Sequence, residues 1–67
     1  MKEYKVELYT GQEESFLTGA LDLLGIPYTI AKGAGVISST IYSFKCKYTD
    51  YVALSSMMKA NFEKHFA

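Results

Sequence analysis

The chain has few of the residues from which reactive and metal-binding sites are built. Its 67 residues include one cysteine, one histidine, one proline and no arginine. A single cysteine excludes an internal disulfide framework and a zinc site made from several thiolates, and it indicates a reducing, cytoplasmic setting. We therefore expect neither a metal nor another cofactor.

The chain also has no excess of positive or negative charge and no long hydrophobic run. Seven basic side chains balance seven acidic ones, so no net field draws the chain to nucleic acid or to anionic lipid. The longest apolar run is far below the roughly 18 residues that cross a bilayer, and the first residues lack the apolar stretch of a signal peptide. We expect no membrane partner, and the balanced charge disfavours a nucleic-acid partner.

The composition is that of a compact folded protein, with 49% hydrophobic, 15% aromatic and 21% charged residues. A chain of this length forms one domain, here residues 1–67, and buries only about 60% of the surface that it exposes when unfolded. Its core is therefore thin.

The first half of the sequence predicts a strand followed by a helix. Residues 3–10 alternate between apolar and polar side chains, which is the period of a half-buried strand. Thr10 and Glu13 then have the spacing of a capping box. Apolar residues recur at helical spacing up to Leu24, and the glycine and proline that follow are typical of a helix end.

Three more elements are expected after this helix. Residues 26–31 alternate as a short strand, residues 32–35 break it, and residues 38–48 form a longer strand rich in β-branched and aromatic side chains. Thr49 and Asp50 supply a helix cap. The final helix runs almost to the terminus, and one face of it carries Tyr51, Leu54, Met58, Phe62 and His65 or Phe66.

This order, βαββα, predicts an α+β fold: a single-layer, three-stranded antiparallel sheet with two helices on one face. It resembles the ferredoxin-like fold lacking its last strand, and it is similar to small nitrogen-regulator-like and ligand-sensing domains. The first strand then lies antiparallel beside the third, where Glu3 and Glu7 meet Lys45 and Lys47 on the open face. A solvated face that carries charges for solubility is the other explanation of this pattern.

Residues 5–10 and 20–28 also resemble the opening of a glutaredoxin. The stretch between them carries Glu13, Glu14 and Ser15 and has no Cys-x-x-Cys pair, and the later part lacks the proline turn with which a redoxin presents its substrate. We therefore assign no redoxin active site to this chain.

We expect that this protein is not an enzyme. Cys46 and His65 are the natural nucleophile and base, but about 15 helical residues place them roughly 22 Å apart, and Cys46 points to the core side. Glu13 and Glu14 splay in different directions and Asp22 lies two turns on, so no carboxylate pair converges for acid–base work.

The glycine-rich segment between the second and third strands has two interpretations. Two glycines one residue apart let backbone NH groups turn toward an anion, to which the lysine adds charge. A simple turn between strands explains the same pattern. The segment that could contact a ligand or a protein consists of Lys32, Gly33, Ala34, Gly35 and Val36.

Aromatic residues on the third strand raise the question of RNA, since RNA-recognition sheets stack bases on exposed rings. These rings share their side of the strand with Cys46, while the opposite side carries lysines and serine. We therefore expect the rings to lie in the core beneath the helices: Tyr42, Phe44 and Tyr48.

Only a short stub follows the final helix, so we expect no fourth strand and an open edge along the first. Two copies of this strand can pair antiparallel around Val6, with Lys5 opposite Glu7 and Tyr4 opposite Leu8. The alternative is that lysines guard the edge against pairing. The residues of this interaction edge are Lys2, Tyr4, Lys5, Val6, Glu7 and Leu8.

Together these features predict a non-catalytic protein-interaction module, that is, a binder, inhibitor or adaptor that docks on a larger protein by its edge, by residues 32–38, or by both. We also expect a homodimer. Accessory proteins of phages and mobile elements are one source of chains of this size. The alternative function is a sensor of a nucleotide or other small ligand, resembling nitrogen-regulator-like proteins and using the glycine-rich segment. Weak RNA binding is the third.

Overall fold

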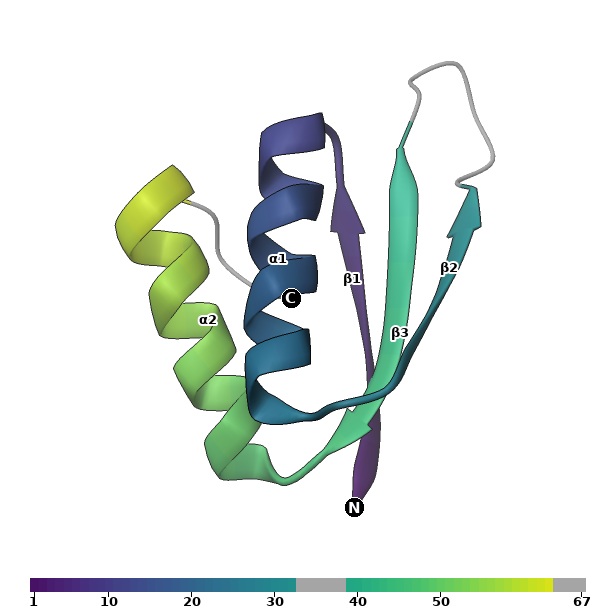
Figure 1. The fold of residues 1–67 in the computed structure, drawn as a ribbon, viewed down its shortest axis with the longest axis vertical. Coiled ribbons are helices and arrows are strands. Elements are labelled where there is room, and N and C mark those ends of the chain that lie inside the picture. The colour runs from purple at the N-terminus through teal and green to yellow at the C-terminus, as the bar shows by residue number, and fades with distance from the viewer. Residues whose placement is uncertain (33–38, 64–67) are drawn as a thin grey trace.

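The computed structural model describes residues 1–32 and 39–63 of the chain. Three strands and two helices follow one another in the order βαββα, as the sequence predicts (Figure 1). The elements are β1 (Lys2–Leu8), α1 (Gly11–Leu24), β2 (Tyr28–Lys32), β3 (Thr40–Cys46) and α2 (Tyr48–Phe62).

The strands form one antiparallel sheet in the order β1-β3-β2, with the last strand of the sequence in the middle. β1 pairs with β3 from Lys2 opposite Cys46 to Leu8 opposite Thr40. β2 pairs with the other side of β3, and Tyr28 lies opposite Phe44. Both helices lie on the same side of the sheet (Figure 1). The predicted α+β fold is therefore confirmed, and its strand order agrees with a ferredoxin-like arrangement.

The core lies between the sheet and the two helices. At the far end of α2 the helices meet through Phe16 and Phe62, whose rings are in edge contact with centroids 5.5 Å apart. Apolar side chains from every second position of β1 and β3 point toward the helices, as the alternation predicts. The buried apolar residues are Val6, Leu8, Leu17, Leu21, Ile26, Tyr42, Phe44, Cys46, Leu54 and Met58.

α1 begins and ends with the caps that the sequence predicts. The Thr10 hydroxyl accepts a hydrogen bond from the Glu13 backbone NH at 3.2 Å, and the Glu13 carboxylate accepts one from the Thr10 NH at 3.1 Å. Gly25 closes the helix in the left-handed conformation, with φ of 69°. The capping box is confirmed, and Tyr9 and Thr10 belong to this helix start instead of to β1.

β2 begins two residues later than the sequence predicts. Ile26 was expected in the strand, but its backbone NH donates to the carbonyl oxygen of Leu21 at 2.9 Å, and its side chain is buried. This bond is part of the C-terminal cap of α1. Ile26, the first residue of the predicted strand, therefore belongs to the cap of α1 and not to β2.

The boundary between β3 and α2 also differs from the prediction. β3 ends at Cys46, and α2 begins at Tyr48, with Lys47 as its N-cap residue and no side-chain hydrogen bond at that cap. The cap predicted at Thr49 and Asp50 is wrong, because both lie inside the first turn. Tyr48 is 70% exposed, so its expected place in the core is wrong as well. α2 ends at Phe62, and Glu63 caps it in the left-handed conformation. His65 and Phe66, the last residues of the predicted helix face, lie outside the described residues.

One of the two predicted charge contacts across the sheet has the right partners. Glu3 lies directly opposite Lys45 in the register. Glu7 lies opposite Ile41, and Lys47 is outside the strand, so the expectation that these two residues join the charge pairing is wrong. Among the residues that the structure describes, no helix has both the length and the apolar character to cross a membrane.

Candidate functional site

The outer edge of β1 is the longest strand edge left without a neighbour in the described parts of the chain. β1 has seven residues and its only partner among them is β3. On the helix side Val6 and Leu8 are buried, while Lys5 and Glu7 are exposed on the open side. The backbone hydrogen-bonding groups of this edge therefore lie between apolar side chains on the helix side and charged side chains on the open side.

Helix α2 forms a wall beside this edge. Tyr4 of β1 stacks on Tyr51 of α2, with ring centroids 3.9 Å apart and an angle of 13° between the rings. The ammonium of Lys2 lies 5.8 Å from the centroid of the Tyr4 ring. Burial raises the pKa of Tyr51 above its ordinary value, and the negative charge that Tyr4 carries when it is deprotonated adds to this effect. The stack thus fixes α2 relative to the first half of β1.

The other end of the edge is held by Glu7. One carboxylate oxygen accepts a hydrogen bond from the hydroxyl of buried Ser39 at 2.7 Å, and the other accepts one from the Tyr9 hydroxyl at 2.9 Å. The bond from Tyr9 and the negative charge of Glu7 both raise the pKa of Tyr9. Sequence reasoning missed Ser39, since 32 residues separate it from Glu7 and no local pattern joins them. These bonds fix a negative charge beside the edge.

The second strand edge, along β2, is less suited to docking. It is five residues long, and Pro27 precedes it directly. Proline at the start of an edge strand is one of the features that discourage pairing. Lys32, the first residue of the predicted glycine-rich site, is exposed at the end of β2. The rest of that site, Gly33, Ala34, Gly35 and Val36, lies outside the described residues, so it stays a prediction.

The face of the sheet opposite the helices is polar. Along β3 only Ile41 and Ser43 are half-buried there, and their neighbours on the outer strands are exposed. The rings of Tyr42 and Phe44 point to the helix side and are buried, which confirms their predicted place in the core. They are therefore not available to stack on RNA bases. The open face carries Glu3, Lys5, Glu7, Thr29, Ala31, Ile41, Ser43 and Lys45.

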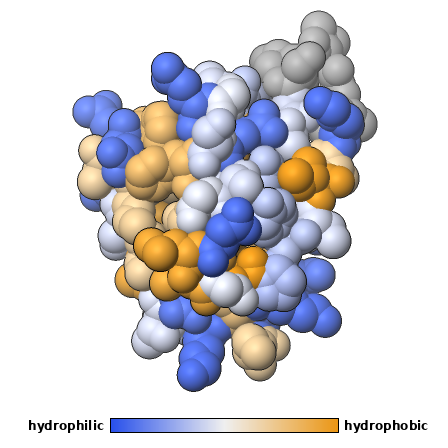
Figure 2. Space-filling model, in the orientation of Figure 1, coloured by the Kyte–Doolittle hydropathy of each residue, from blue (hydrophilic) through white to orange (hydrophobic). Residues whose placement is uncertain are grey.

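Exposed apolar side chains gather elsewhere, where α1 ends and α2 begins. Leu23 is 85% exposed and Leu24 42%, and Tyr48 and Val52 are exposed in the first turns of α2. The two helix ends lie at the same end of the molecule (Figure 1). Figure 2 shows apolar atoms over this lower part of the helical layer. This surface suits contact with a protein better than the polar sheet face does.

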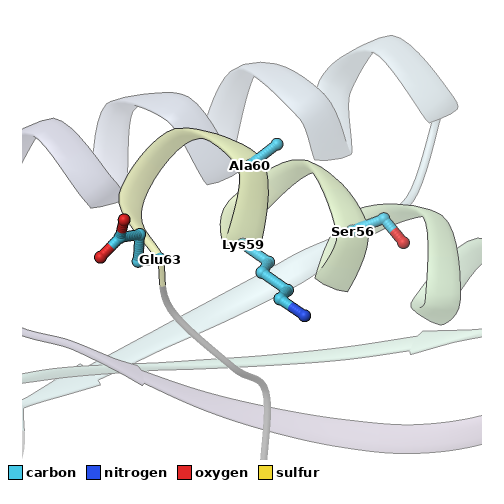
Figure 3. Close-up of a pocket in the computed structure, with 4 residues that line it drawn as sticks. All are labelled: Ser56, Lys59, Ala60 and Glu63. Carbon is cyan, nitrogen blue, oxygen red and sulfur yellow. The ribbon is translucent and has the colours of Figure 1, made fainter.

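A hollow of about 650 Å³ lies against α2 but does not form a reactive site. Its lining residues lie on the side of the helix opposite Leu54 and Met58, which are buried. Their side chains point in different directions and do not converge on one position (Figure 3). These residues are Ser56, Lys59, Ala60 and Glu63.

A second hollow beside α1 contains polar groups that satisfy one another. The Tyr42 hydroxyl donates to a carboxylate oxygen of Glu14 at 3.3 Å, and it lies 3.3 Å from the Thr18 hydroxyl. Thr18 also donates to the backbone carbonyl of Glu14 at 2.7 Å. This network joins the helix to the sheet.

The groups considered for catalysis are not brought together in the described structure. Cys46 is buried, and burial raises the pKa of its thiol above the ordinary value, which disfavours the reactive thiolate. His65 lies outside the described residues. Glu13 is buried, and one of its oxygens accepts hydrogen bonds from the Tyr9 NH, the Thr10 NH and the Thr10 hydroxyl. Within residues 1–32 and 39–63 no group of three metal-ligating side chains forms.

The arrangement therefore offers docking surfaces: a strand edge walled by α2, and exposed apolar side chains where α1 ends and where α2 begins. Comparison of the sequence and the fold with family models, curated proteins and solved structures gave no match.

Proposed function

We propose that this protein is a non-catalytic interaction module that binds another protein by adding a strand to the outer edge of β1. One observation carries this proposal: seven residues of β1 have a partner on one side only within the described chain. Backbone NH and CO groups along such an edge are a ready template for a further strand.

The surroundings of the edge support strand addition over docking on the open sheet face. That face is mostly charged or polar, and its most apolar side chain on β3, Ile41, is only half-buried. Beside the edge, the stacked rings of Tyr4 and Tyr51 give an added strand an apolar wall on the helix side. Lys5 and Glu7 give it opposite charges on the other side.

Exposed apolar side chains at the ends of the two helices supply further contacts on the same partner. Leu24 and Val52 are each 42% exposed, and both belong to the helical layer that flanks the edge. Protein interfaces combine a buried apolar centre with a polar rim. A binder, inhibitor or adaptor that covers part of a larger protein needs only such surfaces and no reactive group.

Hydrogen exchange on the complex tests this function. A partner captured from the native cell is added at micromolar concentration, and amide exchange is compared in the free and bound protein. We expect alternate amides of β1 to become protected, because an added strand bonds every second residue, while β2 amides keep their exchange rates. Protection confined to β2 or to the polar sheet face would contradict the proposal. A rise in melting temperature with a nucleotide would favour the ligand sensor instead.

A further inference from the structure

We infer that a second copy of this chain is one partner of the β1 edge, and that two sheets join there into one continuous sheet around a twofold axis at Val6. The inference rests on the proposed function, since both assign the β1 edge as the docking surface. An axis perpendicular to the sheet makes the two copies of β1 antiparallel and keeps all four helices on one side.

The charges of β1 select the register of this pair. An axis at Lys5 would align the whole strand, but it would place Lys5 opposite its own copy and Glu3 opposite Glu7 of the copy. An axis at Val6 places Lys5 opposite Glu7 of the copy, and symmetry repeats this pair. Opposite charges directly across an antiparallel pair stabilise it, and like charges destabilise it. The charges therefore disfavour the longest alignment and favour the axis at Val6.

The remaining registers differ in which side chains lie opposite each other on the helix side of the strand. An axis at Tyr4 also pairs opposite charges, but it places Lys2 opposite the apolar Val6 of the copy. With the axis at Val6, Tyr4 lies opposite Leu8 of the copy, so an aromatic residue meets an aliphatic one. Charge and hydrophobicity agree only for the axis at Val6.

Strand pairing alone does not bury enough surface for a stable dimer. Val6 is 5% exposed and Leu8 is completely buried, so pairing removes little further apolar area from β1 itself. Stable interfaces bury about 1,200–2,000 Å² in total. A second contact between the copies is required, and it must lie next to β1.

Helix α2 is placed to make this contact. The stack of Tyr4 on Tyr51 fixes α2 beside β1, and α2 lies on the side of α1 away from β2 (Figure 1). Joining two β1 strands about 4.8 Å apart therefore brings the two copies of α2 side by side. Side chains of α2 such as Lys59 point away from α1, toward the space that a second copy would occupy (Figure 3).

A stripe on this side of α2 suits a contact between helices. Its residues are spaced four, three and four apart, so they share one face of the helix. Tyr48 is 70% exposed and Val52 42%, although both are large apolar side chains. The stripe consists of Tyr48, Val52, Ser55 and Lys59.

The twofold axis crosses this stripe near Ser55. Val6 lies two strand residues beyond Tyr4, which is roughly 6.6 Å, and the same rise along α2 takes about four residues beyond Tyr51. At the axis the small Ser55 meets its own copy and lets the helices approach closely. Val52 then packs against the methylene stem of Lys59 of the copy. The dimer covers the β1 edge, so another protein binds there only after the copies separate.

Two pairs of variants test the dimer by analytical ultracentrifugation of the full chain. Lys5→Glu places a carboxylate opposite Glu7 of the copy, and symmetry repeats this like-charge pair, so the dimer dissociation constant should rise about tenfold or more, while Lys5→Gln should raise it less. Val52→Lys should weaken the dimer by opposing Lys59 of the copy, and Val52→Glu should give a dimer about tenfold tighter than Val52→Lys. Both positions are exposed, so the fold is expected to survive, and circular dichroism checks that it does.

A wild-type chain that stays monomeric up to millimolar concentration would overturn this inference. So would a dimer whose dissociation constant is the same for both members of each variant pair. If the chain is monomeric but a captured protein still protects the β1 amides, the proposed function stands and the self-pairing fails. If the dimer behaves as expected, the exchange experiment is run below the dimer dissociation constant, where the β1 edge of the free chain is open. A captured protein that leaves β1 amides unchanged there means that the proposed function fails and the self-pairing stands.

Discussion

Tyr4 and Tyr51 lie face to face, with ring centroids 3.9 Å apart, and this contact joins the edge strand β1 to the helix α2. Tyr4 also lies near Phe44 of the central strand, with centroids 6.3 Å apart. Both tyrosines are only half-buried. The stack is therefore the outermost contact of the core, at the point where the sheet edge meets the helical layer.

Removing one ring of this stack should destabilise the protein and loosen the edge. We expect Tyr51→Ala to lower the free energy of unfolding by about 2 kcal/mol, because a half-buried aromatic contact and its apolar area are lost. Tyr51→Phe keeps the ring and serves as the control, with an expected change below about 0.5 kcal/mol. Urea denaturation measures both. Equal losses in the two variants would show that the hydroxyl, and not the stack, stabilises the contact.

Stability should fall at alkaline pH in two steps. Burial raises the pKa of Cys46 above its ordinary value of 9.0, and burial and the charge of Tyr4 raise the pKa of Tyr51 above 10.0. A folded-state pKa above the unfolded one gives stability that is complete below the unfolded pKa and is lost as pH rises through the folded one. Thermal unfolding should therefore show melting temperatures that begin to fall near pH 9. Cys46→Ala should move this onset toward pH 10, and an unchanged onset would contradict the assignment.

The capping box of α1 should contribute more than an exposed helix cap does. Glu13 is buried, and one oxygen accepts three hydrogen bonds from Tyr9 and Thr10. Thr10→Ala should cost about 1 kcal/mol, and Glu13→Ala should cost about 2 kcal/mol, because buried donors lose their acceptor. Gln12→Ala, at an exposed position of the same turn, should change the stability little. A loss at Gln12 as large as that at Glu13 would contradict this account.

Much of the fold could be predicted from the sequence because its signals are local. Thr10 and Glu13 mark the start of α1 and Gly25 its end by spacing alone, and the alternation in β1 assigns Val6 and Leu8 to the core side. Element order then limits the sheet to few topologies. The strand order β1-β3-β2 follows from these signals together.

The errors occurred where one residue satisfies two patterns. Ile26 alternates with its neighbours as a strand residue does, yet its NH caps α1. Thr49 and Asp50 are good capping residues, but the backbone of Lys47 is already extended directly after β3, and the NH of Tyr51 bonds to its carbonyl at 3.1 Å. Local preference identifies a helix end only to within a few residues, and tertiary contacts decide the final position.

The candidate site was only partly predictable for the same reason. The open edge of β1 follows from element order, whereas its supports are contacts between distant residues. Tyr51 reaches Tyr4 across 47 positions of the sequence, and Ser39 reaches Glu7 across 32. No spacing rule in a single sequence joins such pairs, because they depend on how the helix crosses the sheet.

Gly19, inside α1, and Gly25, at its C-terminal cap, should respond oppositely to the same substitution. A Cβ would meet no atom within 4 Å at either Gly19 or Gly25, so crowding plays no part. Gly25 has a φ of +69°, in the left-handed region, so Gly25→Ala should cost about 1 kcal/mol. Gly19 lies inside the helix, where alanine loses less conformational entropy on folding, so Gly19→Ala should stabilise by about 0.5–1 kcal/mol. Urea denaturation of the two variants measures the difference. Destabilisation by Gly19→Ala would contradict this account.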